Sequence, residues 1–322
     1  MAGTRPTIFV TRRLPPAVTE RLIADYDARL NDDDRPLNDD EVAAGLADAD
    51  GIITASPMKW DAARIAALPK RVTILTTFSV GYEHIDLEAA KARGLRVGNT
   101  PDVLTEAVAD IAMLCLLGAA RRVVEATSTL RGGRWTGFHT TQFVGMELHG
   151  RKLGIVGMGR IGRAIARRAR GFGLAVHYHN RHRLPADEEQ GAVFHDRLDS
   201  LLPEVDAVSL SCPATPETKL MVDGEFLAQM KPGSILVNTA RGALVDETAL
   251  KVALASGHLF AAGLDVFHDE PNVDPGLLAL DSVFALPHIG SATVDTRNAM
   301  GFCCLDNLDA HFAGRPLPFG LV

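Results

Sequence analysis

Short apolar runs alternate with longer helical patterns along almost the whole chain of 322 residues. This alternation is typical of βαβ units, and runs that are apolar on both faces are typical of parallel strands covered by helices on either side. The length suggests two domains of about 100 to 200 residues each. The sequence therefore predicts an α/β fold with two parallel sheets, in two Rossmann-like or flavodoxin-like domains.

The expected elements fall into two series separated by one long helix. In the first series we expect strands at residues 7–12, 51–55, 72–78 and 96–100, helices at 16–28 and 60–68, and a polar surface turn at 31–41. A long helix is expected from Pro101 to about Gly133. The second series contains the strands "LGIVG", "LAVHYH", "AVFH", "AVSLSCP", "SILVNTA", "AAGLDVF" and "VFALPH", followed by a final helix from Thr293 to about Phe312.

A glycine motif, G-x-G-x-x-G, stands between the strand "LGIV" and a helical pattern. It comprises Gly157, Met158, Gly159, Arg160, Ile161 and Gly162. The first glycine permits a tight turn, the second lets a pyrophosphate approach the backbone, and the third allows close packing of helix on strand. A tight turn without a ligand is the alternative. Because the motif follows a complete α/β unit, we expect a dinucleotide-binding Rossmann domain (102–287) inserted into a substrate domain (1–101 and 288–322).

The turn after the next strand is basic where an acidic residue is usual. A Rossmann site for NAD commonly has a carboxylate about 20 residues beyond the glycines, which binds the adenine ribose. This chain has Asn180, Arg181, His182 and Arg183, and its next acidic residue is Asp187. Guanidinium groups bind phosphate through charge-assisted hydrogen bonds. The pattern favours NADP(H), with NAD(H) as the weaker alternative and a solvated basic turn as the non-functional one.

Composition and charge exclude several classes of partner. The formal net charge of -7 argues against nucleic acid or an anionic membrane, because both need a basic face. The apolar stretch Ile111–Ala120 is shorter than the roughly 20 residues of a membrane span. With no signal-peptide pattern and no disulfide-type cysteine spacing, we expect a cytoplasmic protein with free thiols. We expect no metal, because the histidines at 177, 179 and 182 follow strand alternation without acidic or cysteine partners nearby.

Six motifs occur in one order along the chain: "VGYEHID", "NTPDVLTEAVAD", "GIVGMGRIG", "LVNTARGALVDE", "GLDVFHDEP" and "LPHIGSAT". In these motifs the chain resembles the D-isomer-specific 2-hydroxyacid dehydrogenases, from about Thr7 to the final helix. Within that family the Asn-Arg-x-Arg turn is most similar to the NADPH-linked glyoxylate/hydroxypyruvate reductases, which often also reduce 2-ketogluconate.

The resemblance implies a catalytic triad of Arg241, Glu270 and His288. The Arg241 guanidinium suits the carboxylate and carbonyl oxygen of a 2-oxo acid. Histidine has an ordinary pKa of about 6.5, and an adjacent carboxylate raises that pKa and favours the imidazolium form. The implied reaction is hydride transfer from NADPH to C2 while His288 protonates the carbonyl oxygen and Arg241, with the backbone of Val80 and Gly81, binds the substrate. The product is a D-2-hydroxy acid.

The resemblance also implies the rest of the cofactor site and a partner. Asp265 is expected to hold the nicotinamide carboxamide. Further residues assigned to the cofactor are Thr105, Cys212, Pro213, Thr218, Thr239, Ala240 and Gly290. The long helix after Pro101 and the loop with Trp135 and Phe138, which in related enzymes reaches across a subunit interface, suggest a homodimer.

Other functions remain open at this point. Phosphoglycerate dehydrogenases of the family commonly have an acidic residue after the second nucleotide strand, which this chain lacks. Formate dehydrogenases pair the histidine with glutamine, where this chain has Glu270. The corepressors of the C-terminal-binding-protein type share the fold and triad but act mainly as dinucleotide-dependent protein-binding scaffolds. A nucleotide-binding module without catalysis is a further alternative. Singly, Arg241, Glu270 and His288 have ordinary structural interpretations, and their joint occurrence at strand ends favours catalysis.

Overall fold

Two compact units make up the chain. The structure is a computed structural model that describes residues 5–322. Unit 1 extends to Leu104 and includes Ala292–Val322, and unit 2 is Thr105–Ser291. The predicted boundary placed His288 with the first domain, but it lies in unit 2. The reason is that Ile289 and Gly290, the next two residues, donate their backbone N–H groups to the carboxylate of Asp265, which ties this segment to unit 2.

Unit 1 is built on a five-stranded parallel sheet in the order β2-β1-β3-β4-β5, which is the flavodoxin-like order. Its strands are β1 (Thr7–Val10), β2 (Asp27–Arg29), β3 (Gly51–Thr54), β4 (Ile74–Thr77) and β5 (Arg96–Gly98). Its helices are α1 (Pro16–Asp25), α2 (Asp39–Leu46), α3 (Ala62–Ala67), α4 (Leu87–Arg93) and α13 (Val294–Phe312).

Helices cover both faces of this sheet, as the apolar strands require. On one face Phe9, Ile52 and Leu75 pack in a cluster with Trp60. On the other face, alternate strand residues such as Ile8 and Ile74 pack with residues of α1 and α13. Because both faces are buried there, the strands β1, β3 and β4 consist of apolar residues, glycine and threonine.

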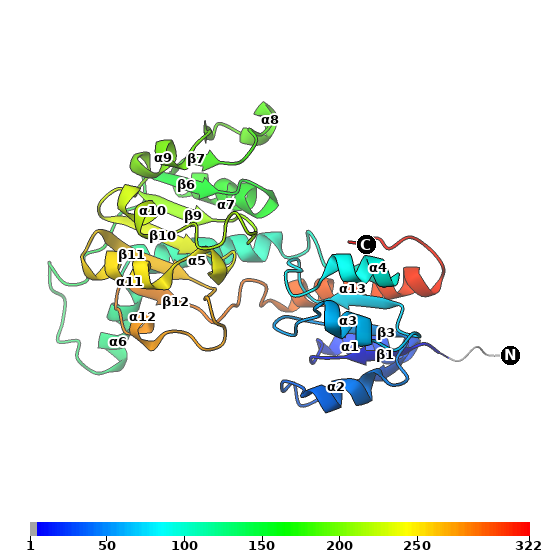
Figure 1. The fold of residues 1–322 in the computed structure, drawn as a ribbon. Helices are drawn as coiled ribbons and strands as arrows, with labels where there is room; N and C mark the ends of the chain where they lie inside the picture. Colours follow the sequence, from blue (N-terminus) through cyan, green and yellow to red (C-terminus); the bar gives the residue numbers. More distant parts are fainter. Residues whose placement is uncertain (1–4) are drawn as a thin grey trace. The chain divides into compact units, whose positions relative to one another are not determined.

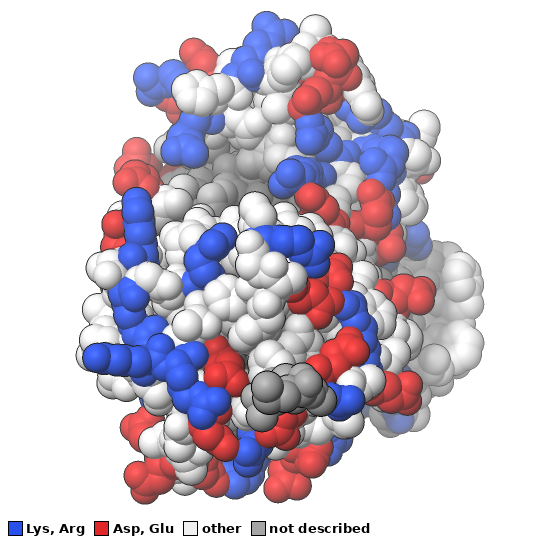
Figure 2. All heavy atoms as spheres, turned by 90° about the vertical axis from the view of Figure 1, so that its right-hand side faces the viewer, with Lys and Arg blue, Asp and Glu red and all other residues white. Residues whose placement is uncertain are grey.

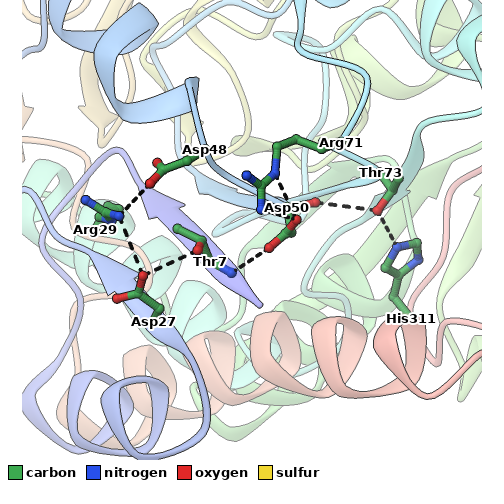
Figure 3. Close-up of polar contacts among 8 residues, drawn as sticks. All are labelled: Thr7, Asp27, Arg29, Asp48, Asp50, Arg71, Thr73 and His311. Atoms are coloured by element: carbon green, nitrogen blue, oxygen red, sulfur yellow. Dashed lines mark hydrogen bonds and ion pairs between the residues drawn. The ribbon is translucent and has the colours of Figure 1, made fainter. Parts of the chain in front are cut away.

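Polar side chains link the amino ends of the strands of unit 1 (Figure 3). The Asp50 carboxylate accepts hydrogen bonds from the Thr7 backbone N–H at 2.8 Å and from the Arg71 guanidinium at 2.9 and 3.1 Å. The Thr73 hydroxyl lies 2.8 Å from Nε2 of His311, at the end of α13. Burial and the charge of Arg96 lower the pKa of His311. These contacts fix strand ends on the edge of the sheet opposite to the usual ligand-binding edge.

Unit 2 is built on a seven-stranded parallel sheet in the order β12-β11-β10-β9-β6-β7-β8 (Figure 1). Its strands are β6 (Lys152–Val156), β7 (Ala175–His179), β8 (Val193–His195), β9 (Ala207–Leu210), β10 (Ser234–Asn238), β11 (Leu259–Leu264) and β12 (Val283–Ala285). The order of the strands reverses at β6, between β9 and β7. A reversal of this kind is the position at which doubly wound sheets bind nucleotides.

The helices of unit 2 cover both sides of its sheet. They are α5 (Thr105–Ala120), α6 (Val123–Arg131), α7 (Arg160–Gly171), α8 (Ala186–Glu189), α9 (Leu198–Leu201), α10 (Gly224–Gln229), α11 (Glu247–Ala255) and α12 (Pro275–Leu278), with short 3-10 turns at Leu202–Glu204 and Gly242–Leu244. Buried residues of α5 and α7 pack with Ile155 and Val237 on one face. Residues of α10 and α11 pack with Val156 and Leu236 on the other.

The prediction of one long helix from Pro101 to Gly133 is wrong, because the chain forms two helices there, α5 and α6. Arg122 has a φ of 51° in the left-handed region, which an α-helix cannot continue through. The α5 segment is largely buried, and a Cβ at Gly263 on β11 would lie 2.4 Å from the Cys115 carbonyl oxygen of α5. None of the residues of α6, all of which the structure describes, is buried.

Two further expectations at the N-terminal part of unit 1 need correction. The helix expected at 16–28 ends at Asp25, and Asp27–Arg29 form the edge strand β2 beside β1. The segment 31–41, expected as a surface turn, already contains the start of α2. Asn38 caps this helix, because its side chain accepts a hydrogen bond from the Glu41 N–H while the Glu41 carboxylate accepts one from the Asn38 N–H.

The surface carries charges of both signs (Figure 2), and the cysteines form no disulfide within residues 5–322. On the face shown in Figure 2, Lys and Arg side chains are interspersed with Asp and Glu side chains. All four cysteines are free thiols, as predicted, and burial raises the pKa of each. Within residues 5–322, no helix has the length and apolar character needed to cross a membrane.

Candidate active site

Three side chains of unit 2 follow neighbouring strands at one edge of its sheet. Arg241 follows β10, Glu270 lies in the loop after β11, and His288 follows β12. These strands are adjacent and parallel, so their carboxyl ends lie at the same edge. That edge is where open α/β sheets bind ligands.

Glu270 and His288 form a hydrogen-bonded pair. Nδ1 of His288 lies 2.6 Å from one carboxylate oxygen of Glu270, and the other oxygen accepts the Phe267 backbone N–H at 2.9 Å. Burial opposes the ionisation of Glu270, but the hydrogen bond and charge of His288, the Phe267 N–H and the charge of Arg241 together lower its pKa. The His288 side chain is half exposed. The carboxylate therefore fixes Nδ1 of the imidazole, and Nε2 is the ring nitrogen that can exchange a proton with a ligand.

Asn238, which the sequence did not single out, shapes the turn that carries Arg241. It is the last residue of β10 and is 1% exposed. Its side-chain oxygen accepts the Ala240 N–H at 3.0 Å, and its side-chain nitrogen donates to the Arg241 carbonyl at 2.9 Å. No pattern in the sequence distinguishes this asparagine from an ordinary turn residue, since its role depends on where its amide points.

Gly242 brings the Arg241 turn against the loop that carries Glu270. A Cβ at this position would lie 1.9 Å from the backbone carbonyl carbon and oxygen of Phe267. Only a residue without a side chain allows this approach of two backbones. The turn that carries Arg241 and the loop that carries Glu270 are thus packed backbone to backbone.

Asp265 holds the segment that contains His288. It is 1% exposed, and its two carboxylate oxygens accept the Ile289 N–H at 2.7 Å and the Gly290 N–H at 2.8 Å. Burial raises its pKa, against the lowering effect of these N–H groups and of His288. The expected contact of Asp265 with a nicotinamide carboxamide stays a prediction, and the contacts present show an additional task in orienting the residues after His288.

The three glycines of the turn after β6 lie in different surroundings. A Cβ at Gly157 would lie 2.5 Å from the Cys212 backbone nitrogen, and one at Gly162 would lie 2.4 Å from the Gly157 carbonyl oxygen. A Cβ at Gly159 would meet no atom of the described chain within 4 Å. Gly157 and Gly162 are thus required by the packing of the chain itself, whereas the space at Gly159 is open to a ligand.

The start of α7 offers donors to an anion. Gly159 occupies the N-cap position and has no side chain to accept the first helical N–H groups. The first turn of α7, which the structure describes completely, has no acidic residue. Asn180 supports the turn from β7, because its side-chain oxygen accepts the Met158 N–H at 2.6 Å. These residues fit the pyrophosphate of a dinucleotide, which helix N-termini bind well.

The two arginines of the basic turn lie in different surroundings. The Arg183 guanidinium donates to both carboxylate oxygens of Glu189, at 2.8 and 3.0 Å. Arg181 is exposed, and within residues 5–322 its side chain makes no hydrogen bond or ion pair. Glu217, in the loop after β9, has its pKa lowered first by a hydrogen bond with Thr215 and in smaller part by the charge of Arg181. The loops after β7 and β9 follow the two strands that flank β6 in the sheet, so both begin beside the strand that leads into the glycine turn.

The other predicted cofactor residues of unit 2 lie mostly beyond the same strand ends. Thr105 is the first residue of α5, and Arg160 and Ile161 begin α7. Thr239 and Ala240 follow β10. After β9, the Thr218 hydroxyl donates to the Pro213 carbonyl at 2.8 Å, which closes the loop that begins at Cys212.

Val80 and Gly81 belong to unit 1, in the loop after β4. The Val80 carbonyl accepts a hydrogen bond from the Asn99 side chain at 2.8 Å, and the Gly81 carbonyl accepts one from the Ser79 hydroxyl at 2.6 Å. Within residues 5–322 their own N–H groups donate no hydrogen bond. Two backbone donors at the carboxyl end of β4 are thus held in place with their N–H groups available.

Known proteins are similar to this chain over most of its length. Residues 113–290 match the family described as D-isomer specific 2-hydroxyacid dehydrogenase, NAD binding domain. The chain is 39% identical to a glycerate dehydrogenase of Hyphomicrobium methylovorum, over 99% of this chain and 100% of that protein. It is 41% identical to a glyoxylate reductase of Thermococcus onnurineus, over 98% and 95% of the two chains.

A solved structure is similar over nearly the whole chain. It is an NADPH-dependent glyoxylate/hydroxypyruvate reductase of Sinorhizobium meliloti in complex with NADP and malonate, with a TM-score of 0.86, 37% identity and coverage of 99% of this chain and 97% of that one. The match of the family to more than half of the chain and the full-length relatives lead to one conclusion. The chain belongs to the D-isomer specific 2-hydroxyacid dehydrogenase family.

Proposed function

We propose that this protein uses NADPH to reduce glyoxylate to glycolate, and to reduce hydroxypyruvate and also 2-ketogluconate to the corresponding D-2-hydroxy acids. The observation that carries the proposal is the 2.6 Å contact between His288 and Glu270, beside the turn of Arg241 at the carboxyl ends of adjacent strands. The names of a glyoxylate reductase and a glycerate dehydrogenase among the relatives support the substrate class.

Each residue of the triad has a task that follows from its chemistry. The Arg241 guanidinium binds the substrate carboxylate and lies next to the negative charge that develops on the carbonyl oxygen. The Glu270 carboxylate accepts a hydrogen bond from Nδ1–H of His288 and thereby directs Nε2 towards the substrate. His288 donates a proton from Nε2 to the carbonyl oxygen as the general acid. The N–H groups of Val80 and Gly81 are proposed to bind the same substrate.

The cofactor site is proposed to comprise the glycine turn, the start of α7 and the basic turn after β7. When bound, the nicotinamide supplies the hydride that reduces C2 of the 2-oxo acid. The N–H groups that follow Gly159 hold the pyrophosphate, and Asp265 holds the carboxamide. The basic turn Asn180–Arg183 holds the adenine ribose and its 2′-phosphate, and the NADP complex of the Sinorhizobium meliloti relative supports this choice.

We propose a homodimer as the functional assembly. The residues of α6 are partly or fully exposed, and the following loop exposes Trp135, Phe138 and Val144. Large apolar side chains grouped on one surface segment are typical of a protein–protein interface. The proposed compartment is the cytoplasm, because the four cysteines are free thiols.

Initial rates of NADPH and NADH oxidation with glyoxylate, hydroxypyruvate and 2-ketogluconate test this function. We expect turnover with a clear preference for NADPH, and we expect Arg181→Ala to reduce that preference. Arg197→Ala is the control, because it removes another exposed positive charge of unit 2, one that pairs with Asp199. A preference for NADH contradicts the cofactor proposal. Nucleotide binding without turnover of any of the three acids contradicts the proposed reaction.

A further inference from the structure

Arg183 belongs to a network of hydrogen bonds centred on the Glu189 carboxylate. Its Nε and one terminal nitrogen donate to the two carboxylate oxygens of Glu189 at 2.8 and 3.0 Å. The Tyr178 hydroxyl of β7 donates to the same carboxylate at 2.7 Å and accepts the Leu184 N–H at 3.0 Å. The strand before the turn, the residue after it and the helix that follows are therefore joined through one carboxylate.

The carboxylate at the centre of this set is buried. The Glu189 side chain is 8% exposed and Tyr178 is fully buried, whereas the Arg183 side chain is 65% exposed. Arg183 also lies over the ring of Phe194, 5.9 Å from its centroid. If the guanidinium moved to a phosphate, Glu189 would keep a buried negative charge without its cationic partner, which is strongly unfavourable. The contacts thus hold Arg183 where it is.

The position of Glu189 is itself fixed from a second side. Its backbone carbonyl accepts a hydrogen bond from the Arg170 guanidinium of α7 at 2.9 Å. The helix that starts at the glycine turn and the turn that follows β7 are therefore both attached to α8. This attachment gives the carboxylate a set location relative to the proposed phosphate site.

Arg181 differs in each of these respects. It is exposed, and within residues 5–322 no carboxylate forms an ion pair with it. We propose that Arg181 alone of the two arginines reads the 2′-phosphate of NADPH, while Arg183 is a positioning residue that Glu189 and Tyr178 hold in order to set the turn. This inference rests on the proposed preference for NADPH and assigns different roles to the two arginines of the basic turn.

The test is the affinity of the full-length protein for two nucleotides, measured by calorimetry without turnover. Adenosine 2′,5′-bisphosphate carries the distinguishing phosphate, and adenosine 5′-monophosphate lacks it. We expect Arg181→Ala to weaken binding of the bisphosphate by about 10- to 100-fold and to leave the monophosphate unchanged, as loss of a charged hydrogen bond implies. We expect Arg183→Ala and Glu189→Gln to weaken both nucleotides by the same factor.

Conservative and distant variants separate positioning from misfolding. Arg183→Lys keeps a positive charge beside Glu189 and should recover part of the affinity for both nucleotides. Arg197→Ala removes one exposed charge elsewhere in unit 2 and should change neither. A thermal melt of each variant checks that it is folded.

Two results overturn the inference in distinguishable ways. If Arg183→Ala selectively weakens the bisphosphate while Glu189→Gln has no effect, Arg183 binds the phosphate directly and the positioning role is wrong. If the native protein binds both nucleotides equally, the preference for NADPH is wrong, and so is the phosphate-reading role of Arg181. In that case Arg183→Ala and Glu189→Gln must still weaken the monophosphate equally, or the positioning role is wrong too.

Discussion

Asn238 uses both ends of its side-chain amide to hold the backbone that presents Arg241. The amide accepts the Ala240 N–H and donates to the Arg241 carbonyl, so both hydrogen bonds belong to one turn. Asp265 acts in the same way on the Ile289–Gly290 segment beyond His288. At the scale of single residues, the candidate active site therefore depends on buried polar groups that orient the reactive ones.

Replacing Asn238 by alanine tests this dependence. We expect Asn238→Ala to raise the KM for glyoxylate about 10-fold, because the turn no longer fixes the guanidinium that binds the substrate carboxylate. We also expect it to lower the free energy of unfolding by about 2 kcal/mol, since two hydrogen bonds are lost from a buried site. Steady-state kinetics and urea unfolding measure the two effects, and Asn238→Asp serves as the partial replacement. An unchanged KM contradicts this role of Asn238.

The sequence predicts the reactive residues more readily than the residues that orient them. Arg241, Glu270 and His288 stand in motifs of fixed order after apolar strands, so sequence alone proposes them as the catalytic residues. The roles of Asn238 and Glu189 depend on hydrogen bonds to other segments, which no local pattern specifies. For the same reason the sequence could not distinguish Arg181 from Arg183, because both occupy one basic turn and only the fold brings Glu189 to Arg183.

At the scale of elements, the connection from β6 to α7 combines two kinds of glycine. Gly157 has a φ of 99° and lies against the backbone of Cys212, so the packing of unit 2 requires it. Gly159 has open space where a Cβ would be. Gly157 thus serves the packing of the sheet, and the open space at Gly159 is where we propose that the ligand approaches.

Alanine at Gly157 should affect stability, whereas alanine at Gly159 should affect nucleotide binding. We expect Gly157→Ala to lower the free energy of unfolding by about 1 to 3 kcal/mol, because the new Cβ overlaps backbone atoms and the φ is strained. Gly159→Ala should leave stability unchanged and should weaken NADPH binding about 10-fold or more, because the Cβ occupies the space proposed for the pyrophosphate. Thermal melting and nucleotide titration test both. Full affinity in Gly159→Ala contradicts the proposed location of the phosphates.

The sequence predicts which segments form helices or strands better than it predicts the residues at which they begin and end. The apolar strands of both sheets and the final helix follow the expected pattern, because burial on two faces leaves a strong signal in the sequence. The break at Arg122 escaped prediction because the helical pattern of α5 continues into α6, and only the left-handed backbone of Arg122 separates them. The short edge strand β2 is exposed and polar at Asp27 and Arg29, so it lacks that signal.

At the scale of the molecule, α6 and the loop after it are the clearest candidates for a contact between copies. Leu130, Trp135 and Phe138 expose 61%, 55% and 87% of their surface. The net charge of the chain is -7, so two copies need an apolar contact to offset their mutual repulsion. This combination favours a homodimer whose interface includes these side chains.

The oligomeric state is measurable by size-exclusion chromatography with light scattering. We expect a mass near twice that of the chain, and we expect Phe138→Asp together with Trp135→Ser to shift the protein towards the monomer. Val252→Asp is the matched control, because Val252 is 65% exposed on α11, away from this segment in the sequence. A native monomer contradicts the proposed assembly.

The central claim for the whole protein is that His288 donates the proton during reduction of a 2-oxo acid. The most direct measurement is kcat/KM for glyoxylate with NADPH at neutral pH, in the native protein and in His288→Asn, with the NADPH affinity of both determined by titration. A general-acid role predicts that His288→Asn lowers kcat/KM by about 10²- to 10⁴-fold, the usual contribution of such a group, and leaves NADPH affinity unchanged. Turnover by His288→Asn within a few-fold of the native rate would contradict it.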